Sequence, residues 1–357
     1  MTAPKDVSLL AECRRLAQTD GARFAAFGAL MLALVASFAV ASGYFRFGLT
    51  PASVVDRQQG ARAFEGFRRA HAKGICVAGV FRSNGALASR SVASVFEARE
   101  TPFVGRFSIG GTNPTAPDLK AGVRSLALDF RLSNGERWRT AMNINPVLGV
   151  RTPEAFYEQL GALAADPSTG RPSPERLQAF FAAHPESEAF RRWQSAYTAS
   201  SSFASEAYHG INAFLLVDAR GARQPVRWSA EPVERPAINA HTDNDALQAE
   251  LADRLRSAPV RFRFVFTLAG DGDAVNDASA PWPSSRERVD AGLIEVRTAF
   301  SQQGGSCDAI NFDPLVLPAG ILPSDDPILH ARSAAYAESQ RRRARERATE
   351  AALEVLR

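Results

Sequence analysis

Cysteine is scarce in this chain. Among its 357 residues only three are cysteine, Cys13, Cys76 and Cys307, and none of them forms a CxxC pair. This excludes a scaffold held together by many disulfide bridges. Cys76 and Cys307 could pair in an oxidising compartment, but Cys76 lies in the apolar run GICVAGVF, where a buried free thiol is the favoured state.

Lysine is equally scarce, so arginine supplies nearly all of the positive charge. It occurs only at Lys5, Lys73 and Lys120, in a chain whose net charge is +4 and whose pI is about 9.2. Acidic and basic residues are interspersed along most of the sequence, and only residues 341–347 are locally basic. Because no long basic stripe is present, we expect no nucleic-acid partner.

Several familiar site signatures are also missing. The HExxH and GxSxG motifs are absent, and SIGGTNP at 108–114 matches neither phosphate-binding loop pattern. The acidic loop GDGDAVND at 270–277 lacks the ligand spacing and the closing glutamate of an EF-hand. These absences exclude the usual zinc-protease, hydrolase, nucleotide and EF-hand calcium motifs.

One long uncharged run is present near the N-terminus. It extends from Phe24 to Phe45, and as a helix it would measure roughly 33 Å, which is enough to cross a bilayer. Four basic residues precede the run and only two follow it closely: Lys5, Arg14, Arg15 and Arg23 before, and Arg46 and Arg57 after. The sequence therefore predicts a single-pass transmembrane helix.

The charge asymmetry also predicts the orientation of this helix. Under the positive-inside rule residues 1–23 stay in the cytoplasm, and residues 46–357 form a domain on the periplasmic side of the inner membrane. A cleaved signal peptide is the alternative, because Ala39-Val40-Ala41 would pass as a cleavage site. The run is longer than a typical signal-peptide core, which favours the uncleaved anchor.

The rest of the chain shows strands first, then helices, then strands again. Thr152 and Ser173 each precede a proline and are predicted helix N-caps, and Ser133-Asn134-Gly135 is a predicted hairpin turn. Strands are predicted at 75–81, 103–110, 123–132, 136–144, 212–218, 224–230 and 260–270, and helices at about 152–165, 177–184, 188–197 and 244–257. This pattern predicts an α+β fold with an antiparallel sheet large enough to close into a barrel.

Tyr336 lies in the terminal stretch ARSAAYAESQRRRA at 331–344. If this stretch is helical, Arg332, Tyr336, Gln340 and Arg343 share one face. A guanidinium one turn from the phenol would stabilise a phenolate, the form in which tyrosine binds ferric iron. Taken alone, the stretch is more typical of a solvated, arginine-rich terminal helix.

Several other segments of the chain form one pattern together with the Tyr336 stretch. His71 lies in FRRAHAKGICVAGVF at 67–81, Ser108 in TPFVGRFSIGG at 101–111, and Asn143 in AMNINPVLGVRTPEAFY at 141–157. Further matching segments occur at 208–221, 276–283 and 310–336. Together these segments resemble the haem catalases, and more closely their short relatives, the catalase-related peroxidases. The resemblance extends from about Phe45 to Arg345.

The resemblance implies a haem pocket in a catalase-like barrel with flanking helices. Its implied catalytic residues are His71 as distal base, Asn143 as distal amide, and Ser108 as the serine that orients the imidazole. Tyr336 is the implied ligand of the iron in haem b. Haem contacts are implied for Arg68, Arg106 and Arg343 at the propionates, Phe156 against the porphyrin, and Arg332 as the partner of Tyr336.

The chemistry of these residues agrees with the implied roles. A neutral histidine can take the proton from one peroxide oxygen and return it to the other, which forms water and a ferryl haem. The Asn143 amide can hydrogen-bond the bound peroxide, and an anionic proximal ligand favours heterolysis. The expected function is therefore a haem peroxidase that reduces hydrogen peroxide or organic peroxides with a small organic reductant.

Departures from the catalase pattern leave alternatives open. Gln340 stands where catalases usually have histidine, Leu148 replaces an aromatic residue, and Ala70 replaces a larger valine, which would enlarge the distal pocket. The alternatives are a true catalase, a haem enzyme that rearranges fatty-acid hydroperoxides, and a non-catalytic haem- or lipid-binding barrel. The chain ends about twenty residues after the haem tyrosine, so the resemblance leaves the oligomeric state open.

Overall fold

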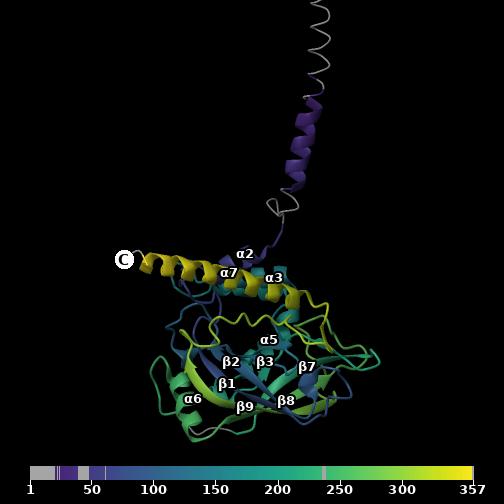
Figure 1. Cartoon of the computed structure of the whole chain (residues 1–357). Coiled ribbons are helices and arrows are strands. Elements are labelled where there is room, and N and C mark those ends of the chain that lie inside the picture. Colours follow the sequence, from purple (N-terminus) through teal and green to yellow (C-terminus); the bar gives the residue numbers. More distant parts are fainter. Residues whose placement is uncertain are drawn as a thin grey trace, which may run out of the picture. The chain divides into compact units, whose positions relative to one another are not determined.

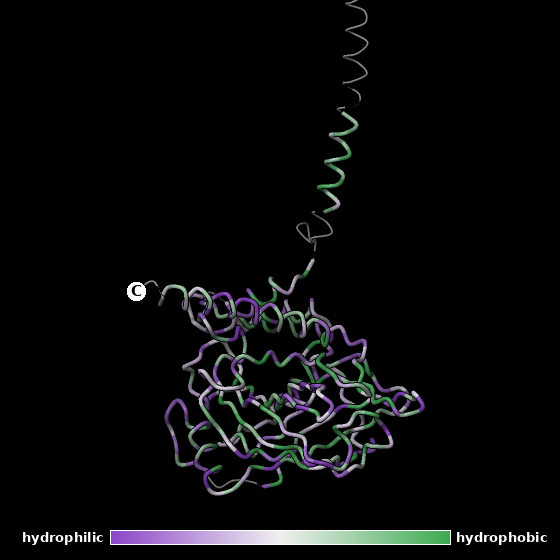
Figure 2. The backbone as a smooth tube through the Cα atoms, viewed as in Figure 1, coloured by the Kyte–Doolittle hydropathy of each residue, from purple (hydrophilic) through white to green (hydrophobic). Residues whose placement is uncertain are grey.

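The computed structural model describes residues 21, 23, 25–38, 48–60, 62–234 and 239–355. The chain divides into two units, Met1–Thr50 and Pro51–Arg357. In the first unit residues 25–38 are helical, and Figure 2 shows this helix mainly in hydrophobic colours. No helix in the described part of the chain is long and apolar enough to cross a bilayer. Phe24 and residues 39–45 of the predicted span lie outside the described residues, as does most of segment 1–23.

The second unit is organised around one antiparallel sheet. Its strands are β1 (Gly74–Ser83), β2 (Glu100–Ile109), β3 (Arg124–Arg131), β4 (Arg137–Asn143), β5 (Tyr208–His209), β6 (Phe214–Val217), β7 (Arg223–Pro232), β8 (Val260–Leu268), β9 (Arg288–Ser301) and β10 (Ile321–Pro323). The order is β10-β6-β7-β5-β4-β3-β2-β1-β9-β8, and β7 also pairs with β8. Because β7 pairs with β8, the strands from β7 to β8 in this order close into the predicted barrel within the described residues, and Figure 1 labels several of them. Beside this closed part, β6 pairs with β7 and β10 pairs with β6.

Aromatic side chains fill the interior of this barrel. Phe130 stacks on Trp138 at 5.0 Å between ring centroids, and Phe264 packs edge-on against Phe81 at 5.5 Å. All four rings are fully buried, and each ring pair contributes about 0.5–1.5 kcal/mol beyond the area that it buries. Because rings occupy the interior, a large polar site has to lie at an end of the barrel, outside this core.

The helices are short apart from the last. They are α2 (Pro51–Gln59), α3 (Pro153–Ala162), α4 (Pro174–Ala183), α5 (Glu188–Ala196), α6 (Ala246–Ser257) and α7 (Pro327–Val355), with 3-10 turns at Ser94–Phe96, Asp118–Lys120, Pro185–Ser187 and Phe203–Ser205. The predicted N-caps are confirmed: Thr152 accepts from the Ala155 N–H at 3.2 Å, and Ser173 accepts from the Arg176 N–H at 3.3 Å. In Figure 1, α7 runs beside α2 and α3, and all three contact one another.

The strand β9 is the main element that the sequence did not predict. It pairs with β1 on one side and with β8 on the other, so it closes the barrel. Both pairings contain a register shift, and Gly292 has φ 125 in a place where a Cβ would lie 2.0 Å from the Arg82 carbonyl oxygen. Such irregularities break the simple alternation by which half-buried strands are recognised.

The expectation of free thiols at Cys76 and Cys307 is wrong, because a disulfide joins them. Both residues are fully buried, and their Cα atoms lie 5.4 Å apart. Cys76 pairs with Phe300 across β1 and β9, and the turn after β9 brings Cys307 back onto β1. Sequence patterns could not show this return. A bridge between residues 231 positions apart closes a long loop and typically stabilises a fold by about 2–5 kcal/mol.

Candidate active site

Three polar residues form a row at one end of the barrel. Ser108 on β2 pairs with Ser125 on β3, and Ser125 pairs with Asn143 at the end of β4. Residues that are directly paired in antiparallel strands place their side chains on the same face of the sheet. The regular β-strand register therefore sets these three side chains next to one another.

His71 completes this row. Its Nδ1 lies 3.4 Å from Ser108 Oγ and 3.3 Å from Ser125 Oγ, and the hydroxyl of Ser125 donates to Asn143 Oδ1. The structure thus brings together the three predicted catalytic residues, His71, Ser108 and Asn143. Ser125 was missed, because its only clue is the strand register between 123–132 and 136–144.

The backbone of His71 is unusual. Its φ of 52 places it in the left-handed region, and it is the one described non-glycine residue with a positive φ. Such strain persists only where neighbouring groups enforce it. Arg106 Nη2 donates to the carbonyl of His71 at 2.7 Å and to that of Ala72 at 3.3 Å, and the Ala72 N–H donates to Gly111 O at 3.0 Å. Arg106 therefore holds the backbone segment that carries the His71 imidazole.

Electrostatics keep the His71 imidazole neutral. Desolvation by the surrounding protein is the largest cause, followed by the positive charges of Arg106, Arg332 and Arg68, and together they lower the pKa of His71 to about 4. At neutral pH the ring therefore has a free nitrogen lone pair. A histidine in this state can accept a proton from a bound ligand.

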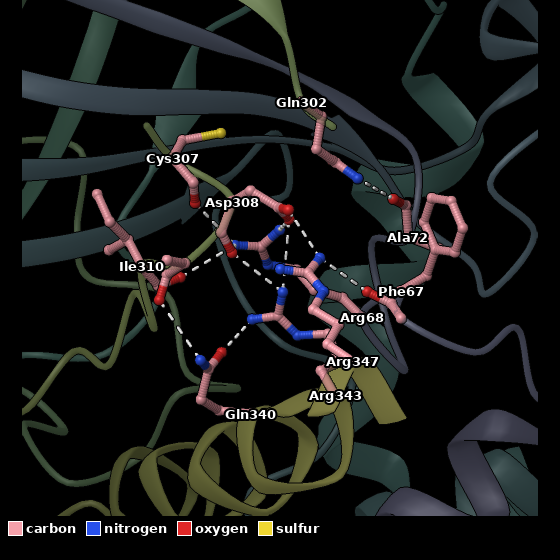
Figure 3. A network of polar contacts seen from close by, with 12 residues as sticks. Phe67, Arg68, Ala72, Gln302, Cys307, Asp308, Ile310, Gln340, Arg343 and Arg347 are labelled. Atoms are coloured by element: carbon pink, nitrogen blue, oxygen red, sulfur yellow. Dashed lines mark hydrogen bonds and ion pairs between the residues drawn. The ribbon is translucent and has the colours of Figure 1, made fainter. Parts of the chain in front are cut away.

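Three arginines, Arg68, Arg343 and Arg347, surround the carboxylate of Asp308, as Figure 3 shows. Asp308 lies 2.7 Å from Arg347 Nη2, 3.6 Å from Arg343 Nη1 and 3.8 Å from Arg68 Nη1. Arg68 Nη2 also donates to the carbonyl oxygens of Cys307 at 3.1 Å and Ile310 at 2.9 Å. The disulfide-linked segment around Cys307 therefore orients Arg68.

This cluster has more buried positive charge than nearby carboxylates can balance. Burial, followed by the charge of Arg343, lowers the pKa of Arg68 to about 9, and burial, followed by the charge of Arg347, lowers that of Arg343 to about 10. Arg106 is affected most, since burial and then the charges of Arg68 and Arg343 hold its pKa well below the usual value. An anionic ligand bound beside these guanidinium groups would offset this repulsion.

Two buried guanidinium atoms of the cluster lack hydrogen-bond partners, which points to the same excess of positive charge. Arg68 Nη1 and Arg343 Nε are buried and make no hydrogen bond with any residue that the structure describes. Arg106 instead uses Nε to bond Gln302 Oε1 at 2.7 Å. Buried donors of this kind normally have partners, and guanidinium groups bind carboxylates well. The arrangement fits the two propionate carboxylates of a haem.

The predicted ligand pair lies on α7. Arg332 Nη2 donates to Tyr336 Oη at 3.4 Å and to the Ala141 carbonyl at 3.2 Å, so it links α7 to β4. Arg332 Nη1 donates to Asn212 Oδ1, and Asn212 Nδ2 donates to Asp326 Oδ2 at 2.8 Å. This relay fixes the guanidinium of Arg332 beside the phenol oxygen of Tyr336.

Asn212 and Asp326 of this relay were not predicted as site residues. Asp326 is fully buried, and burial raises its pKa. It also accepts from the Ile328 N–H at 2.9 Å and immediately precedes Pro327, the first residue of α7. An aspartate before a proline at a helix start is a recognisable N-cap pattern, and it was the available clue.

Two further residues singled out in the sequence, Phe156 and Gln340, lie in different surroundings. Phe156 on α3 packs with Leu148 against a separate apolar cluster of Val150, Ala155, Ala162 and Phe180. Gln340 accepts from Arg343 Nη2, and its own Nε2 donates to the Ala309 carbonyl at 3.4 Å. Gln340 thus helps to position Arg343 of the arginine cluster. Phe156 instead belongs to the apolar cluster.

Comparison with known proteins settles the family. Residues 61–257 match the family model described as Catalase. The chain belongs to the catalase family. This confirms the resemblance seen in the sequence and the prediction that the chain is an oxidoreductase of the haem peroxidase type.

Individual relatives refine the comparison. The chain is 35% identical over 322 residues to the catalase-related peroxidase of Synechococcus elongatus, covering 88% of this chain and 95% of the relative. It is 32% identical over 299 residues to that of Mycolicibacterium paratuberculosis, covering 82% and 94%. The catalase of Pseudomonas syringae is 26% identical, and the matched part spans 56% of its length.

A solved structure supports the fold. A bacterial catalase superposes with a TM-score of 0.66 at 20% sequence identity. The match covers 79% of this chain and 58% of that catalase. The catalase-like barrel with helices is therefore confirmed. The chain spans little more than half the length of that catalase.

Proposed function

We propose that this member of the catalase family reduces hydrogen peroxide or organic peroxides with a small organic electron donor, using haem b. The observation that carries the proposal is the hydrogen-bonded group of His71, Ser125 and Asn143, in which the imidazole is neutral. This group combines a base with an amide, which is what peroxide cleavage requires. A non-catalytic haem- or lipid-binding barrel would need no such group.

The chain offers groups for each part of a haem. The Tyr336 oxygen would ligate the iron, Arg68, Arg106 and Arg343 would bind the propionates, and Phe156 would pack against the porphyrin. Bound haem would supply the electrons that break the peroxide O–O bond. The excess of buried guanidinium groups described above supports this use of the arginines.

The protein's own part in the reaction is to move protons and orient groups. His71 would take the proton from one peroxide oxygen and return it to the other, which leaves as water or an alcohol. Asn143 donates a hydrogen bond to the peroxide. Arg332 holds the Tyr336 oxygen in position, since it donates to that oxygen at 3.4 Å. The organic donor then returns the enzyme to its resting state.

We expect peroxidase turnover to exceed oxygen evolution. The relatives named catalase-related peroxidase match this chain over 94–95% of their own length, and Ala70 leaves more room beside His71 than the valine of catalases. Steady-state oxidation of a phenol should be compared with oxygen release at the same peroxide concentration. The matched variant Ala70→Val is expected to lower the ratio of phenol oxidation to oxygen release. Oxygen release far above phenol oxidation in the parent would identify a true catalase instead.

We also propose that the catalase-like domain lies on the periplasmic side of the inner membrane, anchored by residues 24–45. The fully buried disulfide between Cys76 and Cys307 supports this, since stable disulfides are typical of oxidising compartments. The charge pattern around the apolar run supports the orientation.

Thiol trapping in acid-quenched cells tests this location. With the protein unfolded but not reduced, a maleimide should label Cys13 alone, and after reduction it should label all three cysteines. Cys76→Ser should free Cys307 for labelling. Labelling of Cys76 and Cys307 without a reductant would contradict an oxidising location.

A further inference from the structure

Ser125 occupies a position that connects the two distal residues. It is buried on β3 with 7% of its surface exposed, and it is paired directly with Ser108 on one side and Asn143 on the other. Its Oγ lies 3.3 Å from His71 Nδ1, and it bonds Asn143 Oδ1. One hydroxyl therefore contacts both the imidazole and the amide.

Counting protons gives each of these bonds a direction. The amide oxygen of Asn143 has no hydrogen and can only accept, so the single hydroxyl proton of Ser125 must point towards it. Towards His71, Ser125 can then only accept. The hydrogen in that bond must come from His71 Nδ1, and in a neutral imidazole this leaves Nε2 with the lone pair. The low pKa of His71, about 4, means that the ring is neutral at physiological pH.

Ser108 cannot determine which nitrogen of His71 carries the proton. Its Oγ lies 3.4 Å from the same Nδ1, and no third group among the described residues fixes the direction of its hydroxyl. A hydroxyl in this situation can either donate or accept. Ser108 therefore fits either tautomer of His71, whereas Ser125 is constrained by Asn143.

The orientation of Asn143 is part of the same selection. If the amide were reversed, its nitrogen would donate to Ser125, and Ser125 would donate to His71 Nδ1. The proton of the imidazole would then lie on Nε2, which could no longer act as a base. With its Oδ1 facing Ser125, Asn143 keeps its amide nitrogen as a donor for the peroxide.

We propose that Ser125 is a positioning residue that holds His71 in the tautomer protonated at Nδ1 and, through the same hydroxyl, fixes the amide orientation of Asn143. This rests on the proposed function, because it states how the peroxide-binding side is prepared before the substrate arrives. Replacing Ser125 with alanine is expected to remove the hydroxyl that selects the tautomer while the imidazole, the amide and the arginines stay in place.

Nitrogen NMR of the imidazole reads this tautomer directly, without any turnover. The full chain would be labelled with ¹⁵N-histidine and loaded with diamagnetic zinc protoporphyrin IX, and two-bond correlations would be recorded at neutral pH. We expect the Nδ1-protonated pattern in the parent and in Ser125→Thr, which keeps the hydroxyl. Ser108→Ala should keep this pattern, whereas Ser125→Ala should give a mixture of tautomers or the Nε2-protonated form.

Peroxide kinetics provide a second measurement. Ser125→Ala should lower the second-order rate constant with peroxide by about 10-fold or more, since a mis-set tautomer removes the base, while the KM for the organic donor stays unchanged. An Nε2-protonated parent, or a Ser125→Ala spectrum identical to the parent's, would overturn the proposal. If Ser125→Ala does not fold, Ser125→Gly takes its place, and the parent spectrum alone can still contradict the proposal.

Failure of the proposed function would be visible separately. A chain that takes up no porphyrin contradicts the haem site, and the histidine spectrum of the chain as purified then still tests the tautomer. Porphyrin uptake together with the wrong tautomer contradicts the role of Ser125 alone.

Discussion

Replacing His71 with alanine is expected to lower the second-order rate constant for peroxide cleavage by roughly 10²–10⁴-fold, the usual contribution of a positioned general base. Haem content should change little, because the predicted haem contacts of the arginines and Tyr336 do not depend on the imidazole. Stopped-flow mixing with peroxide, at matched haem content, measures the effect. An unchanged rate constant would contradict the role given to His71.

The chain provides a matched control in His209. This histidine is half-buried on β5, where it pairs with Asn143 of β4, and desolvation lowers its pKa to about 4 as well. In the described part of the chain no hydrogen bond joins His209 to Ser108 or Ser125, which both lie close to His71 Nδ1 instead. His209→Ala should therefore keep most of the rate of peroxide cleavage. An equal loss in both variants would point to general destabilisation of the barrel end.

The pH dependence follows from the same group. Because the pKa of His71 is lowered to about 4, peroxide cleavage should be constant from neutral pH down to about pH 5 and fall as the pH passes through 4. The sign for stability is also defined, since the unfolded chain takes up this proton near pH 6.5 and the folded chain only near 4. The contribution of His71 to folding stability therefore declines as the pH falls between these values.

Local patterns were sufficient to predict much of the fold. The strand around Phe264 alternates apolar and polar residues, the strand around Val77 is a short apolar run, and Thr152 and Ser173 each precede a proline, so each was recognisable within a short window. That the sheet closes into a barrel could be predicted only at the level of fold class. The strand that completes the barrel, β9, has bulges that interrupt its alternation of apolar and polar residues.

The parts that were missed depend on contacts between distant segments. Cys307 meets Cys76 only because the chain turns back after β9, and Asp308 meets the arginines for the same reason. Ser125 reaches His71 through a register between strands that a sequence window does not contain. The predicted residues His71, Asn143 and Tyr336 came from resemblance, and their roles remain predictions that the geometry supports.

The Tyr336→Phe variant is expected to have the second large effect. The phenyl ring fills almost the same space but lacks the oxygen that would ligate iron, and Arg332 loses the partner that it contacts at 3.4 Å. Haem affinity should fall by roughly 100-fold, which corresponds to about 3 kcal/mol. Haem titration of the apo-protein measures this change.

Tyr157→Phe is the control for this substitution. Tyr157 lies on α3, where Arg57 stacks over its ring at 4.2 Å, so the variant removes a phenol oxygen and keeps the ring contact. Its haem affinity should match that of the parent. A similar loss in both variants would mean that the effect comes from helix packing.

The visible absorption spectrum of the parent beside Tyr336→Phe, both expressed with a haem supply, tests the account most directly. We predict a high-spin ferric haem spectrum in the parent that is lost or strongly altered in the variant. A folded parent without haem, or an identical spectrum in the variant, would contradict a haem enzyme ligated by Tyr336. In that case the chain would have the scaffold of the catalase family without its chemistry.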